Sequence, residues 1–199
     1  MEINYMTIIQ YVKEVTSENG RPTLFPFRSR YEHTMRVYRW AIKLQAIEGG
    51  DLEIITLAAL LHDIGWDAER PHGDVGAEMA IEYLLSIGYD DEVKLGRIGE
   101  IIRIHTEKDT SDDLSLECRI VMDADLLDEV GAISVLWDAM ATATEDEASY
   151  KKAYQRIKNF CRINKPKIRR CKTNAGRREY EKRMDIIESF LEELEKELY

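Results

Sequence analysis

The stretch LEIITLAALLHDIG (Leu52–Gly65) decides the fold, because it is apolar on nearly every side of a helix up to Ile64. Such a helix must be surrounded by other elements, so the stretch predicts a central helix. Asp51 can cap its N-terminus, and the glycine at its end stops it. The stretch closes on His62 and Asp63, which places an imidazole and a carboxylate at the end of a buried helix.

Helical spacing continues on both sides of this stretch. Apolar residues recur three and four positions apart nearly throughout, and no run of alternating β-branched residues competes as a strand. We therefore expect an all-α fold. The expected helices are a short N-terminal one before a loop marked by Pro22 and Pro26, 31–48, 52–64, one opening after His72-Gly73, one carrying Leu95 to His105, one over 114–140 and one over 180–198, with 142–146 as a connector.

Composition indicates one folded domain. The chain has 199 residues, of which 44% are hydrophobic and 33% charged, with a net charge of -10. Residues 151–183 hold fourteen Lys or Arg against two acidic residues. Such a basic segment can attract a phosphorylated ligand or nucleic acid. We favour a solvated helix pair docked on an acidic domain, which makes nucleic acid an unfavoured partner.

Several protein classes are excluded by what the sequence lacks. No apolar run approaches the roughly 20 residues that span a bilayer. The start, Met1-Glu2-Ile3-Asn4, lacks the basic and then apolar order of a signal peptide. We expect a cytoplasmic protein without a membrane partner. Three distant cysteines, Cys118, Cys161 and Cys171, suggest neither a disulfide framework nor a thiolate zinc site.

The four histidines of the chain each lie at a helix end or on an apolar stripe. A single histidine of this kind is more often a core or capping group, so the inference rests on the set. Burying the Asp63 carboxylate costs several kcal/mol unless a cation or donors compensate it. Imidazole and carboxylate ligands suit Mn, Fe, Co, Ni or Zn. A bound metal can lower the pKa of water towards about 7 and polarise a phosphoryl oxygen.

Three motifs in order resemble the HD superfamily: His33 on one helix, Leu60-Leu61-His62-Asp63-Ile64-Gly65 ending the next, and Ala124-Asp125-Leu126-Leu127 on a later one. The resemblance implies a metal-dependent phosphohydrolase of an all-helical, HD-type bundle. It implies that His33, His62, Asp63 and Asp125 hold a divalent metal, and that metal-bound hydroxide hydrolyses phosphomonoesters or phosphoanhydrides, most often of nucleotides. Lys172-Thr173, Arg177 and Arg183-Met184 also resemble the C-terminal region of stand-alone bacterial HD hydrolases.

This resemblance divides the chain into three parts. Residues 1–30 form an N-terminal helix and loop, 31–140 form the HD core, and 141–199 form a C-terminal appendage, in which a basic segment and an amphipathic helix pack on the core. The last helix could also form a homodimer.

His72 and His105 resemble the additional ligands of dinuclear HD proteins, in which Asp63 would bridge two metals. Their order is similar to that of HD diadenosine-polyphosphate hydrolases, cyclic-dinucleotide phosphodiesterases and di-iron oxygenases. The alternative is a single metal, with His72 capping a helix and His105 contacting substrate. We expect one or two divalent ions (Mn, Fe, Co, Ni or Mg) and favour two, because no histidine is then left unexplained.

The fourth ligand of the first metal is either Asp123 or Asp125, and periodicity cannot choose between them. The Ala-Asp-x-Leu order of the family selects Asp125. We expect Asp123 to be a partner of one of the basic helices. Asp128 is expected to be the same kind of partner, or to support a ligand from behind.

Trp66 stands where many HD phosphohydrolases have a phosphate-binding Lys. Arg36, or Lys172 and Arg177, could replace that Lys, because phosphoryl transfer depends on positioning and charge neutralisation. Trp66 is either a stacking wall for a base or a packing residue. Asp67 is either a general acid or base, beside Asp63, or an ordinary loop residue.

Three functions remain open on the sequence. The leading one is hydrolysis of a small phosphorylated metabolite, most often a nucleotide. A di-iron oxygenase and a nucleotide-binding HD domain without turnover are the alternatives.

Overall fold

The computed structural model describes residues 3–18, 25, 27–107 and 113–199, and within them every regular element is a helix. The all-α prediction is confirmed, while Pro22 and Pro26 lie outside the described residues. The elements are α1 (Tyr5–Glu18), α2 (Arg30–Glu48), α3 (Leu52–Leu61), α4 (His72–Ser86), α5 (Glu92–Ile104), α6 (Leu116–Asp128), α7 (Ala132–Ala143), α8 (Tyr150–Asn164), a short 3-10 helix (Lys165–Arg170) and α9 (Asn174–Leu198).

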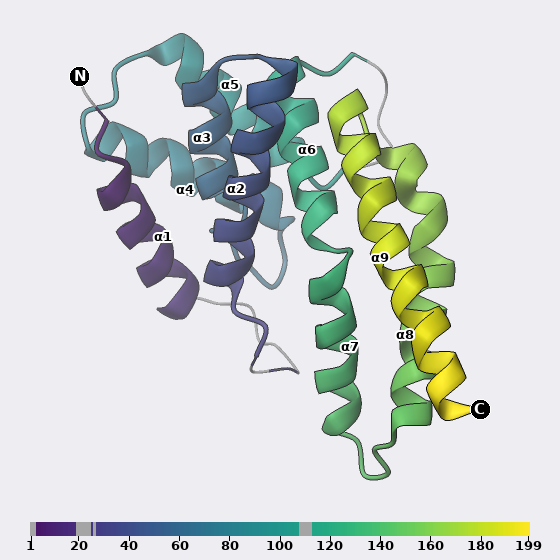
Figure 1. The fold of residues 1–199 in the computed structure, drawn as a ribbon. Helices are drawn as coiled ribbons and strands as arrows, with labels where there is room; N and C mark the ends of the chain where they lie inside the picture. Colours follow the sequence, from purple (N-terminus) through teal and green to yellow (C-terminus); the bar gives the residue numbers. More distant parts are fainter. Residues whose placement is uncertain (1–2, 19–24, 26, 108–112) are drawn as a thin grey trace.

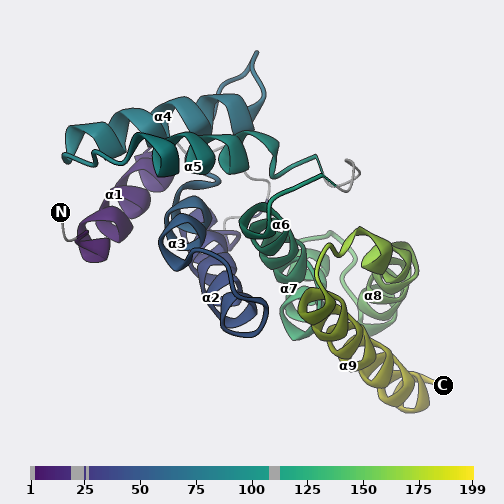
Figure 2. The same ribbon diagram turned by 90° about the horizontal axis from the view of Figure 1, so that it is seen from above.

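Helix α3 is the centre of the first half of the molecule, as its sequence predicts. Every residue from Ile54 to Leu61 is buried, and α2, α5 and α6 pack around it. Asp51 caps its N-terminus by accepting hydrogen bonds from the backbone N–H groups of Glu53 and Ile54. Helices α1 to α5 form one group and α7 to α9 another, with α6 between them (Figures 1 and 2).

The helix predicted over 114–140 is two helices, which corrects the sequence interpretation. Gly131, with φ at +99°, separates α6 from α7. Apolar spacing continues across the break, so periodicity does not reveal it. A Cβ on residue 131 would lie 3.2 to 3.3 Å from atoms of Arg183, so glycine also permits this close approach. The predicted connector at 142–146 begins late, because Thr142 and Ala143 belong to α7.

The C-terminal helices pack on each other and on α6. The apolar stripe of α9 is buried within the chain, against α8, α7 and α6: Tyr180, Met184, Ile187 and Leu191. Several basic side chains of the region pair with acidic ones, namely Arg156 with Asp138, Lys165 with Glu188, and Lys167 with Glu129. A homodimer through α9 stays a prediction.

Two contacts join this C-terminal group to α6. The carboxylate of Asp123 accepts hydrogen bonds from the backbone N–H groups of Lys172 and Thr173 and from the Thr173 hydroxyl, at 2.7 to 2.8 Å. Arg183 Nε donates to the carbonyl oxygens of Leu127 and Val130, both at 3.0 Å. These hydrogen bonds fix the C-terminal end of α6 against α9. Among the described residues, no helix is both long and apolar enough to cross a membrane.

Candidate metal centre

All four histidines converge at one end of α3. His62 and His105 follow directly on α3 and α5, His33 lies in the first turn of α2, and His72 begins α4. Neighbouring rings form a continuous row, with centroids 5.3 Å apart for His33–His62, 5.1 Å for His62–His105 and 5.3 Å for His72–His105. Four segments far apart in the sequence therefore contribute imidazoles to one cluster.

Hydrogen bonds fix which ring nitrogen can bind a metal. Nδ1 of His62 donates to the Ala59 carbonyl at 2.8 Å, and Nδ1 of His105 donates to the Ile102 carbonyl at 2.6 Å. Because a carbonyl only accepts, the proton of each neutral ring lies on Nδ1. In that tautomer the lone pair lies on Nε2, and Nε2 of His62 faces the ring of His33.

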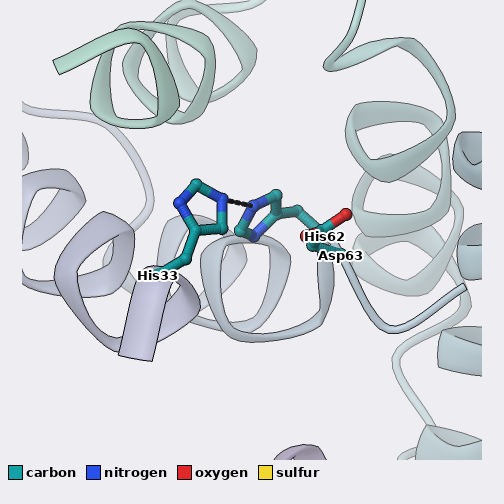
Figure 3. Close-up of side chains that lie close together, drawn as sticks. All are labelled: His33, His62 and Asp63. Carbon is teal, nitrogen blue, oxygen red and sulfur yellow. Dashed lines mark hydrogen bonds between the residues drawn. The ribbon is translucent and has the colours of Figure 1, made fainter. Parts of the chain in front are cut away.

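The Nε2 atoms of His33 and His62 face each other at 3.3 Å (Figure 3). Two nitrogens that each bind one ion at about 2.1 Å lie roughly 3.0 to 3.4 Å apart in octahedral or tetrahedral geometry. Without a metal, a proton on Nε2 of His33 donates to the Nε2 lone pair of His62 across the same distance. The spacing therefore fits a pair of metal ligands.

Burial and neighbouring charges separate the pKa values of these two rings. Burial, aided by the neighbouring His105, lowers the pKa of His62 to about 4, so this ring is neutral at neutral pH. Burial also lowers the pKa of His33, but hydrogen bonds and charge from Asp125 and Asp128 outweigh it and raise the pKa to about 10. A metal would therefore take the place of a proton on His33.

Asp63 belongs to two overlapping sets of ligand atoms. It forms one with His33 and His62 and another with His72 and His105, and within each set the atoms lie within 4.8 Å of one another. Its Oδ1 is 3.8 Å from Nε2 of His72, so the short loop after α3 does bring His72 back to the motif. The two triads therefore share one carboxylate, that of Asp63, and the number of ions they would hold stays a prediction.

Close backbone packing makes that return possible. A Cβ on Gly65 would overlap the backbone N of Gly76 and the carbonyl of His72, and a Cβ on Gly73 would overlap the carbonyl of Arg103. The N-terminal turn of α4 therefore lies directly against the motif and the end of α5.

The two candidate aspartates of α6 have different partners. Asp125 Oδ1 lies 3.4 Å from Nε2 of His33, next to the first triad. Asp123 faces the start of α9 instead, where its carboxylate accepts the three hydrogen bonds described above. The structure thus brings Asp125, and not Asp123, to the histidines.

Asp128 supports His33 from the far side of the ring. Its Oδ2 accepts a hydrogen bond from His33 Nδ1 at 2.8 Å. Arg36 donates two hydrogen bonds to the same carboxylate, from Nε at 2.6 Å and from a terminal nitrogen at 3.0 Å. Arg36 is therefore tied to Asp128 at the edge of the site.

A cavity of about 640 Å³ opens beside the first triad. It includes His33, Asp63, Asp125 and Asp128, with Arg36 at its wall. Its other lining residues belong to no motif of the sequence: Phe25, Phe27, Arg28, Ser29, Arg30, Glu129 and the α7 residues Ile133, Ser134, Leu136, Trp137 and Met140. Arg30 also holds the motif, because its guanidinium lies 3.4 Å from Asp63 Oδ2 and donates to the Asp63 carbonyl at 3.2 Å.

Seven predicted site residues do not line this cavity. Three of them, His62, His72 and His105, belong to the histidine cluster, and the other four are Trp66, Asp67, Lys172 and Arg177. Asp67 accepts hydrogen bonds from the backbone N–H groups of Glu69 and Arg70, which is an ordinary loop role. The backbone of Lys172 binds Asp123, and Arg177 is exposed on α9. The basic residues that face the cavity come from the start of α2 and the segment before it.

Comparison with known families agrees with this arrangement. A family model described as HD domain matches residues 30–129, half of the chain. The chain belongs to the HD domain family. The matched range contains the four histidines together with Asp63, Asp125 and Asp128, and it ends where α6 ends. Membership accounts for the order of the motifs, and the resemblance noted from the sequence is confirmed.

Solved structures of other HD proteins share the whole fold. A predicted HD superfamily hydrolase from an uncultured Thermotogales bacterium is 24% identical, with a TM-score of 0.69 over 98% of this chain and 92% of that one. Bacillus subtilis YpgQ in complex with ADP is 24% identical, with a TM-score of 0.67 over 96% and 93%. An HD-superfamily hydrolase from Bacillus thuringiensis is 24% identical, with a TM-score of 0.67 over 97% and 95%. No curated protein matches the chain in sequence.

Proposed function

We propose that this HD domain is a metal-dependent phosphohydrolase that acts on a small phosphorylated metabolite, with a nucleotide as its substrate. The observation that carries the proposal is a cavity lined by His33 and Asp63, two members of the first ligand triad, together with Arg28, Arg30 and Arg36. Ligands for a cation and side chains for phosphate oxygens thus meet in one place.

The residues have separate roles in this proposal. His33, His62, Asp63 and Asp125 would hold one divalent ion, and Asp63, His72 and His105 a second. When bound, such ions lower the pKa of water and polarise phosphoryl oxygens. Arg30 and Arg36 neutralise charge on the phosphate and orient it, which is most of what phosphoryl transfer requires. Asp128 keeps His33 in the tautomer that presents Nε2.

The size of the cavity favours a ligand larger than a phosphate ion. Its volume of about 640 Å³ lies within the range of small-molecule sites, roughly 300 to 1,000 Å³. YpgQ, which shares the fold, is known in complex with ADP. This supports a nucleotide, and the proposal extends it to the present chain.

A screen of metal-loaded protein tests the proposal. Mn, Fe, Co, Ni and Mg forms are incubated with nucleoside mono-, di- and triphosphates and with sugar phosphates, and phosphate or pyrophosphate release is measured. We expect release from nucleotides, abolished by His62→Ala. A protein that releases nothing with any ion, and whose His62→Ala variant binds metal as well as wild type, would refute it. Tight nucleotide binding without any product would instead favour a binding domain.

The shared Asp63 also favours a second candidate, a di-iron oxygenase, because that chemistry needs two bridged ions. Anaerobically purified protein loaded with iron distinguishes the two candidates. Substrate-dependent oxygen uptake would support the oxygenase, and turnover without oxygen would exclude it.

A further inference from the structure

The cavity has two chemically different ends. The end at the metal centre is lined by carboxylates and by the guanidinium groups of Arg30 and Arg36. The other part is lined by residues of α7, here called the α7 stripe, namely Ile133, Leu136, Trp137 and Met140, together with Phe25 and Phe27. Leu136 is 60% exposed and Met140 47%, so this apolar surface is left uncovered by the described residues.

The α7 stripe offers little to a polyhydroxylated ligand. Three of its four side chains carry no hydrogen-bonding group other than the weak acceptor of methionine. The hydroxyl of the neighbouring Ser134 already donates to the Gly131 carbonyl at 2.7 Å. Sugar hydroxyls placed here would lose their hydrogen bonds to water without replacement, which is unfavourable. An apolar group, or the face of an aromatic ring, has no such hydrogen bonds to water to lose.

Trp137 already carries a flat partner. The guanidinium carbon of Arg28 lies 3.5 Å from the centroid of the indole ring. Both residues line the cavity. The guanidinium thus covers one face of the indole, and a base that stacks on that face would displace it, since nucleobases are planar, delocalised groups of the same kind.

Resting on the proposed function, we propose that the α7 stripe binds the base of the nucleotide, with Trp137 as a specificity-determining residue. Recognition is by stacking and apolar contact and not by hydrogen bonds to the edge of the base. The site therefore distinguishes phosphates that carry a base from those that do not, and it distinguishes poorly among bases.

Equilibrium binding to Mn-loaded protein tests this, with ligands that resist hydrolysis. Calorimetry compares the α,β-methylene analogues of ADP, GDP and CDP with methylenediphosphonate, which has the same phosphonate group and no nucleoside. We expect the three analogues to bind at least about tenfold more tightly than methylenediphosphonate and within about fivefold of one another. Trp137→Leu should reduce the advantage to about threefold or less, and Trp137→Phe should retain most of it.

Two exposed leucines provide a matched control. Leu136→Ser, on the α7 stripe, should weaken binding of the analogues relative to methylenediphosphonate. Leu85→Ser, on α4 and 55% exposed, should leave that ratio as in wild type. Thermal melts of each variant establish that it is folded.

The result that overturns the inference is an unchanged advantage in folded Trp137→Leu, or no advantage in wild type. The proposed function fails separately, through the absence of any metal-dependent hydrolysis in the screen above. A base preference without hydrolysis would leave this inference standing alone, and hydrolysis without a base preference would remove only this inference.

Discussion

His33 Nδ1 donates a hydrogen bond to Asp128 Oδ2 at 2.8 Å, on the side of the ring opposite the candidate metal position. A carboxylate in this place fixes the tautomer and makes the ligating nitrogen more basic. Asp128→Asn should lower the affinity for Mn about 10- to 100-fold, because the amide accepts the same hydrogen bond but has no charge. Competition with a fluorescent chelator measures this. Asp90→Asn, at an exposed position, should bind as wild type does, and equal affinities in both variants would contradict the role.

The two triads that share Asp63 predict two ions per chain. Elemental analysis of protein purified without chelator should give about two equivalents of transition metal. His105→Ala should reduce this to about one, since it removes a ligand of the second triad only. A single ion in wild type, unaffected by His105→Ala, would show that the second triad binds no metal.

Substitutions of the two α6 aspartates should have different effects, one on the stability of the fold and the other on metal binding. Asp123→Ala leaves three donors without their acceptor, one of them the buried Thr173 hydroxyl, so it should cost about 2 to 4 kcal/mol of unfolding free energy. Asp125→Ala should instead remove most of the thermal stabilisation by metal, which at 100 times Kd is about 5 to 10 °C. Thermal melts with and without Mn report both effects. The converse pattern would reassign the fourth ligand to Asp123.

Gly65 and Gly96 form a contrasting pair. Gly65→Ala places a methyl group against the backbone of α4, so it should destabilise the fold by about 2 kcal/mol or more. It should also weaken metal binding by the second triad. Gly96→Ala lies in α5 with nothing within 4 Å of the new Cβ, so it should stabilise by about 0.5 to 1 kcal/mol. Urea denaturation of both variants measures the difference.

Most helices could be predicted because each buries one stripe of regularly spaced apolar residues. The break at Gly131 could not, since Leu126, Val130, Ile133 and Trp137 keep spacings of four, three and four across it. What ends α6 is a positive φ that glycine adopts, together with an arginine about fifty residues later in the chain. Periodicity in one segment has no access to such a distant contact.

The candidate histidine and aspartate ligands could be predicted from the sequence because they come in short, ordered motifs on helices. The cavity walls could not. Arg28 and Arg30 come from a loop and the first position of a helix, and Trp137 from a helix about a hundred residues away, with no spacing that links them. Trp66 was chosen because it adjoins the motif, but adjacency in sequence did not place it in the cavity.

Arg183 has a consequence for how this chain can be divided. One of its hydrogen bonds reaches Leu127 in the last turn of α6 and the other reaches Val130 just beyond that helix. Together with the three hydrogen bonds that Asp123 receives from Lys172 and Thr173, they attach the C-terminal helices to the back of α6. A fragment that ends near residue 140 would retain every candidate metal ligand, yet it would expose the apolar side of α6 and leave the carbonyls at its C-terminal end without these donors. An experiment on a fragment limited to the HD motif range would therefore measure the loss of these contacts with the C-terminal helices as well as the properties of the motif.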